Sequence, residues 1–377
     1  MVVDDSVVAR GFYKRWLDSE PGLEFAASFR SGREAVDHLL RVDPDVLVLD
    51  IEMPDLDGIS ALPLLLEKKP DLAVIMASTL TRRNAEITLK ALALGALDYI
   101  AKPDANNATH SLNFRRELIG KVHGLGRRNR EALSRDAMRA APAAPAARDK
   151  RPVREPRPAE QIAPRPVVHI HVAAPCTHAL PRVAPRAIVI GSSTGGPQAL
   201  THVISGLGDV CRRVPVLITQ HMPPTFTTIM AEHLSRSSGI TVHEARHGEP
   251  VIAGNIYVAP GDVHMRVRKN EQGVAIALDD GPHVHFCRPA VDPLFMSAAE
   301  IWGSHVLGVI LTGMGSDGTD GAAAIVDAGG SIIAQDEATS VVWGMPGSVA
   351  EAGLCAAILP VQEIGPRIAR LFLGDRS

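Results

Sequence analysis

Acidic, hydroxyl and lysine side chains stand at the ends of short apolar runs in the first hundred residues. Asp4 and Asp5 follow the first three residues, Asp50 ends VLVLD, Ser78 ends AVIMAS, and Lys102 follows the run 99–101. The carboxyl ends of parallel strands meet at one edge of a sheet, so we expect these side chains to lie together. Three carboxylates would repel one another there unless a hard divalent cation such as Mg²⁺ lay among them. The lysine could hold a phosphoryl oxygen as a point charge, and the hydroxyl could hydrogen-bond it.

A single aspartate at a strand end is more often a turn or helix-capping residue than a metal ligand. The ordered set DD, D-x-E-M-P-D-x-D-G, S and K-P is far more specific, and it indicates a phospho-acceptor site. Only three residues precede the acidic pair, so we expect a short first strand or a start further upstream.

A second set of reactive side chains begins at the run AIVIGSSTGGPQAL, which predicts a strand, a tight glycine turn and a helix. The pattern from Gly191 to Gly195 fits a nucleophile elbow with Ser193 at the corner. The helix that follows would supply amide donors and a dipole that favours negative charge. Ser192 is the competing nucleophile. A phosphate-binding loop is the competing function, although the Walker lysine is missing.

A serine nucleophile needs a base, and the base needs an orienting group. His221 follows the apolar run 214–219, and Asp317 follows VLGVILTG at 306–313. Three strand ends would then carry Ser, His and Asp in that chain order, whereas α/β-hydrolases run Ser, Asp, His. An isolated histidine at a strand end is usually a core or turn residue. Other residues remain open as orienting acids (Asp262, Asp292 and Asp320) or as substrate-side residues (His264 and Arg288).

The elements that must position these residues alternate between strand-like and helix-like patterns. In the first part, strands at 46–51 and 73–78 alternate with helical periodicity at 33–40, 59–69 and 85–96. From residue 187, further strands are predicted at 187–190, 214–219, 255–260, 306–313, 331–335 and 355–360, and helices at 197–207, 224–235, 292–303, 321–329 and 361–373. This alternation predicts parallel α/β sheets covered on both faces. The runs 264–269 and 274–280 flank a turn and predict an antiparallel hairpin.

Residues 125–186 differ from both flanks, because they contain ten prolines, many alanines and arginines, and few large apolar side chains. Such a segment buries too little surface to fold, and it predicts a semi-extended linker. Its basic excess indicates a solvated, self-repelling chain, with docking onto an acidic partner as the alternative. The run VVHIHVAA at 167–174 could form a short strand.

The composition excludes several protein classes. No apolar run approaches the roughly 18 residues of a membrane span, and the N-terminus lacks the pattern of a signal peptide. The net charge of −3 argues against nucleic acid as an obligatory partner. The four cysteines stand singly, without metal-like spacing, so we expect buried or inert thiols in a reducing compartment.

The first 104 residues resemble a two-component receiver domain, on the ordered set of residues given above. The resemblance implies a flavodoxin-like, doubly wound parallel sheet in which Asp50 accepts the phosphoryl group. It also implies that Ser78 and Tyr99 are switch residues and that Lys102 is the family's invariant lysine. The implied Mg²⁺ ligands are Asp4, Asp5, Asp50 and the main-chain carbonyl of Glu52.

Residues 187–377 resemble the catalytic domain of chemotaxis protein-glutamate methylesterases, through GSSTGGPQAL, TQHMPPTFT, YVAPGDVHM, RPAVDPLF, GVILTGMGSDG and VVWGMP in that order. The resemblance implies Ser193 as nucleophile, His221 as general base and Asp317 as orienting acid. It also implies that the main-chain N–H of Met314 donates to the oxyanion, with Thr194 nearby.

Together the two resemblances imply a receiver at 1–121, a linker at 122–186 and a mainly parallel α/β hydrolase with a hairpin at 187–377. We expect a cytoplasmic enzyme that demethylates glutamate side chains of chemotaxis receptors and deamidates receptor glutamines. A chemotaxis histidine kinase is the expected phosphodonor. We expect Mg²⁺ in the receiver, no cofactor for the hydrolysis, and neither nucleic-acid binding nor membrane insertion. The rival functions are an adaptor without chemistry and a nucleotide-using enzyme.

Overall fold

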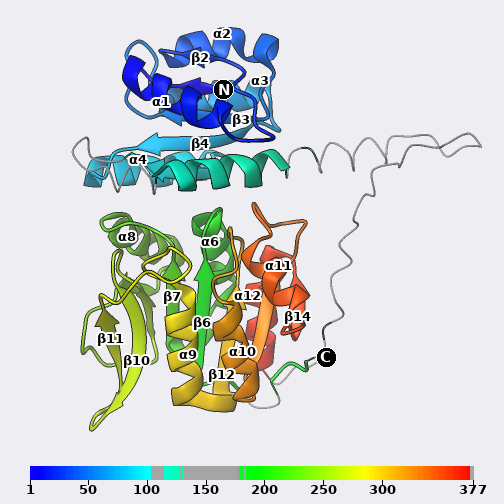
Figure 1. The fold of residues 1–377 in the computed structure, drawn as a ribbon. Coiled ribbons are helices and arrows are strands. Elements are labelled where there is room, and N and C mark those ends of the chain that lie inside the picture. The colour runs from blue at the N-terminus through cyan, green and yellow to red at the C-terminus, as the bar shows by residue number, and fades with distance from the viewer. Residues whose placement is uncertain (103–113, 128–129, 131–175, 177, 182–183, 374–377) are drawn as a thin grey trace, which may run out of the picture.

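The computed structural model describes residues 1–102, 114–127, 130, 176, 178–181 and 184–373, which form two α/β domains stacked one on the other (Figure 1). Most of the linker expected at 122–186, including the possible strand at 167–174, lies outside the described residues. No helix in the described ranges is long and apolar enough to cross a bilayer.

The N-terminal domain contains a sheet of five parallel strands in the order β2-β1-β3-β4-β5. Its central strands β3 and β4 are buried along their whole length, because helices cover both faces. The strands are β1 Val2–Val3, β2 Ser28–Phe29, β3 Val46–Asp50, β4 Ala73–Ser78 and β5 Asp98–Ala101.

Four helices connect these strands, and each begins at a side chain that accepts a hydrogen bond from a main-chain N–H of the first turn. The helices are α1 Val7–Asp18, α2 Gly32–Val42, α3 Gly58–Lys68 and α4 Arg82–Ala93. Residues 114–127 are also helical, and their apolar side chains Phe114, Leu118, Val122 and Leu125 lie in the core of this domain. The domain boundary predicted at residue 121 falls within this helix and stays a prediction.

The C-terminal domain contains a sheet of seven parallel strands in the order β14-β13-β12-β6-β7-β9-β8. In this domain the central strand β6 comes first in the sequence, the next three strands lie on one side of it, and the last three lie on the other side. The strand order therefore reverses between β6 and β12. Sheets of this α/β type bind ligands at such a topological switch point. The strands are β6 Ala187–Ser192, β7 Val216–Gln220, β8 Thr241–Glu244, β9 Asn255–Val258, β12 Val306–Ile310, β13 Ser331–Gln335 and β14 Ala357–Leu359. In Figure 1, β6 points its carboxyl end at the N-terminal domain.

The helices of this domain cover both faces of the sheet, and an antiparallel hairpin stands at one side (Figure 1). The helices are α6 Gly196–Leu207, α7 Val210–Arg213, α8 Phe226–Ser238, α9 Val291–Trp302, α10 Thr319–Asp327, α11 Met345–Glu351 and α12 Val361–Phe372, with a 3₁₀ turn at Gly303–His305. The hairpin consists of β10 His264–Asn270 and β11 Gly273–Asp279. The predicted parallel α/β architecture with one hairpin is therefore confirmed.

Several elements were not predicted from the sequence. They are α1, α7, α11, the helix at 114–127 and the short strands β2 and β8. The two-residue strand β2 and the half-exposed β8 carry no apolar run. The helix α1 keeps Val7, Val8 and Phe12 exposed, so its apolar residues do not form the single stripe that reveals an amphipathic helix.

Candidate active site and phosphorylation site

The serine at 193 stands on the corner between β6 and α6. Gly195 takes a left-handed conformation with φ +76°, and a Cβ there would lie 2.5 Å from a methyl of Val341, so only glycine fits. The main-chain N–H of Ser193 donates to the Thr312 carbonyl at 3.0 Å, which ties the corner to the end of β12. The first turn of α6 follows immediately, as the nucleophile-elbow pattern predicts.

The two adjacent serines have different surroundings, which separates the two candidate nucleophiles. Ser192 is fully buried, and its hydroxyl donates to Gln220 Oε1 at 2.6 Å. Gln220 Nε2 donates in turn to the Ser193 carbonyl at 2.8 Å. Ser192 is thus a structural residue that holds the turn, and Ser193 is left as the candidate nucleophile. Gln220 was missed from the sequence, although a buried amide next to the candidate base is a signal that could have found it.

His221 and Asp317 meet above the sheet. His221 Nε2 lies 2.7 Å from Asp317 Oδ2. The carboxylate also accepts the N–H groups of Val291 at 2.6 Å and Asp292 at 3.1 Å, at the start of α9. Burial alone would raise the pKa of Asp317, but these hydrogen bonds and His221 lower it. Asp317 is therefore a fixed anion that orients the imidazole.

The alternative acids and substrate-side residues have other partners. Asp262 pairs with Arg288 at 2.7 Å, and Asp292 binds His285 at 3.1 Å and the Gly321 N–H at 2.7 Å. Asp320 lies in the same cluster as His285 and Asp292.

His264 is buried and accepts the Ala290 N–H, so it packs rather than faces a substrate. Among the four candidate acids, Asp317 is the one that is hydrogen-bonded to His221 in the described part of the chain.

The second nitrogen of His221 faces a cysteine. Cys287 Sγ lies 3.4 Å from His221 Nδ1, while no hydrogen bond joins Ser193 Oγ to His221 among the residues described. Burial disfavours the imidazolium, yet Cys287 and Asp317 together raise the pKa of His221 well above its usual range. The expectation of buried or inert thiols holds for Cys211 and Cys355. Cys176 is exposed and Cys287 is half-buried beside the candidate base, and the expectation that these two thiols are inert stays a prediction.

The two residues predicted to bind the oxyanion lie at the carboxyl ends of the central strands. Thr194 is buried next to Ser193, and its carbonyl accepts the Thr312 hydroxyl at 2.9 Å. Met314 follows β12, and its side chain reaches the N-terminal domain: a Cβ on Gly120 would lie 2.7 Å from Met314 Sδ. Their oxyanion role stays a prediction.

The carboxylates of the N-terminal domain gather as predicted. Lys102 Nζ lies 2.8 Å from Asp4 Oδ2 and 2.7 Å from Asp50 Oδ2. One oxygen from each of Asp4, Asp5 and Asp50 lies within 4.8 Å of the others. Burial raises the pKa of Asp50 to about 6; Lys102 opposes this, and Asp4 and Asp5 add to it. A crowded set of oxygen donors, whose mutual repulsion one lysine only partly relieves, fits a hard divalent cation.

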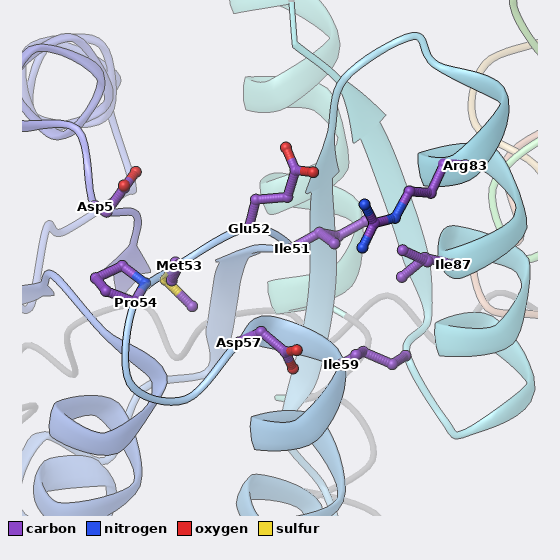
Figure 2. A pocket seen from close by; sticks show the side chains of 9 residues that line it. All are labelled: Asp5, Ile51, Glu52, Met53, Pro54, Asp57, Ile59, Arg83 and Ile87. Atoms are coloured by element: carbon purple, nitrogen blue, oxygen red, sulfur yellow. The ribbon is translucent and has the colours of Figure 1, made fainter.

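A pocket opens beside this cluster (Figure 2), and Asp5 and Glu52 lie on its rim. Arg83 of α4 extends its guanidinium toward Ile51 and Glu52 in the same view. The pocket therefore reaches the acidic cluster at Asp5, whereas Asp4 and Asp50 are buried behind it. The sequence offered no signal for Arg83, because it belongs to a helix rather than to a strand end.

The two predicted switch residues are both buried, and Tyr99 contacts the neighbouring domain. Ser78 is buried and accepts the Thr88 hydroxyl at 3.0 Å. Tyr99 is buried, and its ring stacks on Phe226 of α8 with centroids 4.8 Å apart and planes at 7°. Tyr99, in the edge strand β5 of the first sheet, thus packs directly against the second domain.

Further contacts fasten the two domains together along α4, which lies between the two sheets in Figure 1. Arg82 Nη2 lies 2.9 Å from both carboxylate oxygens of Glu232. Gln198 of α6 donates to the carbonyls of Leu92 and Ala96, the latter at 3.1 Å. Because α6 and α8 begin at the carboxyl edge of the second sheet, the N-terminal domain covers the edge that carries Ser193 and His221.

Comparison with known proteins matches both domains. Residues 1–112 match the family described as the response regulator receiver domain, and residues 188–368 match the family described as CheB methylesterase.

Two relatives span nearly the whole chain. A protein-glutamate methylesterase/protein-glutamine glutaminase of group 2 operon from Rhodopseudomonas palustris is 58% identical over 388 residues, which cover 100% of this chain and 95% of the relative. A protein-glutamate methylesterase/protein-glutamine glutaminase 2 from Caulobacter vibrioides is 52% identical over 370 residues, 98% of this chain and 97% of the relative. Among solved structures, the CheB methylesterase catalytic domain of Thermotoga maritima is 43% identical, covers 50% of this chain and 100% of that chain, and has a TM-score of 0.48.

Proposed function

The chain belongs to the family of CheB protein-glutamate methylesterases with an N-terminal receiver, and on that premise we propose that it demethylates glutamate side chains of methyl-accepting chemotaxis receptors. The observation that carries the proposal is the 2.7 Å contact between His221 and Asp317 beside the glycine corner that presents Ser193. These three strand ends meet at the switch point of the sheet.

The proposed reaction uses the chain's own side chains throughout. Ser193 Oγ attacks the ester carbonyl while His221 Nδ1 takes its proton, because Nε2 is engaged by Asp317. The main-chain N–H of Met314, with Thr194 nearby, stabilises the oxyanion, and the N-terminus of α6 adds a favourable dipole. The imidazolium then protonates the leaving methoxide oxygen, so methanol departs and the acyl-enzyme remains. His221 next takes a proton from the water that attacks the acyl carbonyl, and this proton passes to Ser193 Oγ as the glutamate carboxylate is released. We propose no cofactor for this hydrolysis.

Receptor glutamines are the second proposed substrate. An amide carbonyl can enter the same acyl-enzyme with ammonia as the leaving group, so the same three residues serve both reactions.

Mass spectrometry of a receptor fragment tests both activities. A fragment with methylated glutamates and with glutamines at its modification positions is incubated with the chain, and the masses of its peptides are followed. We expect loss of methyl groups and conversion of glutamine to glutamate, and we expect Ser193→Ala to abolish both. A Ser193→Ala chain that still demethylates at the wild-type rate would sink the mechanism, whereas Ser192→Ala tests the neighbouring hydroxyl.

Regulation is proposed to begin at Asp50, with a chemotaxis histidine kinase as phosphodonor. Asp4, Asp5, Asp50 and the main-chain carbonyl of Glu52 would hold Mg²⁺, which when bound offsets the negative charge that phosphoryl transfer brings to this site. Lys102, already 2.7 Å from Asp50, would hold a phosphoryl oxygen, and Ser78 and Tyr99 would report the change to the neighbouring domain.

We propose a cytoplasmic location and neither nucleic-acid binding nor membrane insertion.

The contacts between the domains support an autoinhibited resting form. The receiver lies over the carboxyl edge of the catalytic sheet and touches Met314, so a receptor helix cannot reach Ser193 while the two domains stay together. Phosphorylation would shift the population toward a separated form, by no more than the difference in phosphoryl stabilisation between the two forms. We propose domain limits of 1–121, 122–186 and 187–377 for the receiver, linker and hydrolase.

A further inference from the structure

Only one nitrogen of the catalytic imidazole is free to serve the nucleophile. Asp317 holds His221 Nε2 at 2.7 Å, and its carboxylate is fixed by the N–H groups at the start of α9. The neutral imidazole therefore carries its proton on Nε2 and its lone pair on Nδ1. In the reaction proposed above, that lone pair must receive the proton of Ser193.

A thiol already occupies this lone pair. Cys287 Sγ lies 3.4 Å from His221 Nδ1, within reach of an S–H···N hydrogen bond, and Ser193 Oγ is not bonded to this nitrogen within the described ranges. We propose that Cys287 is a positioning residue that competes with Ser193 for the base and keeps Ser193 inactive while the receiver is docked. The inference rests on the proposed hydrolase function and adds a second restraint to the covering of the site by the receiver.

The segment that carries Cys287 is held in place from the catalytic domain. Its neighbours His285 and Phe286 both have positive φ, at 50° and 64°, and the main-chain groups of Val284 and Cys287 bond to each other at 3.1 and 2.8 Å. His285 Nε2 is anchored 3.1 Å from the buried Asp292. These bonds set the direction in which the Cys287 side chain points.

The receiver holds the same segment from the other side. The guanidinium of Arg116, in the helix at 114–127, lies 4.3 Å from the centroid of the Phe286 ring. Phe286 is 75% exposed with Arg116 in place, so this cation–π contact is a surface restraint on the segment that the receiver supplies. When the domains separate, Arg116 leaves Phe286, the segment loosens, and Cys287 can release Nδ1 to Ser193.

The test must report on Ser193 without requiring a receptor to enter, so it uses a small fluorophosphonate that labels activated serines. The rate of Ser193 labelling is measured by mass spectrometry in the unphosphorylated full chain for wild type, Cys287→Ala, Cys287→Ser and the control Cys176→Ala, which removes an exposed thiol elsewhere. A net hydrogen bond of the usual strength corresponds to a rate change of roughly five- to tenfold.

We expect Cys287→Ala to label about five- to tenfold faster than wild type, Cys287→Ser to stay near wild type because a hydroxyl also donates to Nδ1, and Cys176→Ala to be unchanged. Cys287→Ala labelling at or below the wild-type rate would overturn the inference, as would Cys287→Ser labelling as fast as Cys287→Ala. Arg116→Ala keeps the thiol and should also label faster, which guards against misfolding at position 287. If Ser193 stays unlabelled in every variant with and without phosphodonor, the proposed hydrolase function itself fails.

Discussion

At the scale of single residues, His221 has a contact on each of its nitrogens, and the Asp317 carboxylate favours its protonated form. Asp317 faces Nε2 and Cys287 faces Nδ1, and the pKa of His221 is raised well above its usual range despite burial. An imidazole accepts the serine proton only while it is neutral, so a raised pKa removes active base as the pH falls.

The pH dependence of Ser193 labelling in the unphosphorylated chain follows from this shift. The rate should rise with pH, with its midpoint above 6.5, the ordinary pKa of histidine. A wild-type midpoint at or below 6.5 would contradict the assignment of His221 as a base held by Asp317.

Replacement of the orienting acid should cost most of the activity. Asp317→Asn keeps the shape but cannot stabilise the imidazolium or hold the same tautomer, so we expect kcat for receptor demethylation to fall by about 10³- to 10⁴-fold. Asp262→Asn is the matched control, because Asp262 pairs with Arg288 instead of His221. Equal losses in the two variants would argue against Asp317 as the orienting acid.

The strand-end rule brought Ser193, His221 and Asp317 forward from the sequence, and the structure places the last two in contact. The rule nominated Asp317 but left Asp292 open as an alternative acid. The structure separates them, because the first N–H groups of α9 hold the Asp317 carboxylate, whereas Asp292 binds His285 and the Gly321 N–H. The contact between Cys287 and His221 could not be predicted from the sequence, because it depends on the conformation of a loop that carries no periodic pattern.

At the scale of elements, the helix at 114–127 is attached to the receiver by a buried lysine. Lys121 Nζ lies 3.0 Å from Asp98, 2.9 Å from Glu117 and 2.5 Å from the Tyr99 carbonyl. Burial lowers the pKa of Lys121, but these acids outweigh it and raise the pKa above 10.5. Its stabilising charge is therefore fully present below pH 10.5 and is lost only as the pH rises through the raised value.

Lys121→Met should destabilise the receiver, because it leaves the buried Asp98 without its cation. We expect the free energy of unfolding to fall by about 3–5 kcal/mol, measured as the receiver transition in calorimetry of the full chain. Lys14→Met is the control, since Lys14 forms an exposed pair with Asp18 whose loss costs about 0–1 kcal/mol. Equal shifts in the two variants would show that Lys121 is not an anchor.

Long buried strands and amphipathic helices could be predicted from the sequence, as β3, β4, β6 and α6 show. The elements that were missed bury little or lack a stripe, as in β2 and α1, so hydrophobic periodicity carries no signal for them.

At the scale of the whole molecule, Gly120 is a point where the receiver helix and the catalytic domain approach closely. A Cβ there would lie 2.7 Å from Met314 Sδ, so Gly120→Leu should force the domains apart. Overpacking costs about 1–3 kcal/mol, which predicts an increase of roughly five- to hundredfold in unphosphorylated demethylation and little change with phosphodonor.

Gly11→Leu is the matched control, because Gly11 also lies in a receiver helix but a Cβ there meets nothing within 4 Å. Methanol release without phosphodonor should rise for Gly120→Leu alone. An unchanged rate for Gly120→Leu would mean that the docked arrangement does not restrain the enzyme.

The docking of the two domains could not be predicted from the sequence. Tyr99 was recognised as a switch position, but its partner Phe226 belongs to an ordinary helical pattern, and nothing in the order of residues pairs the two rings. Contacts between separately folded domains depend on surface shape, which local patterns do not encode.

The central claim is that phosphorylation of Asp50 releases a serine methylesterase, and methanol release from methylated receptor tests it most directly. The full chain is assayed with Mg²⁺, with and without a phosphodonor, beside Asp50→Ala. The account predicts that the phosphodonor stimulates the wild type and leaves Asp50→Ala at its basal rate. Methanol release that is absent in both conditions, or stimulated equally in Asp50→Ala, would contradict it.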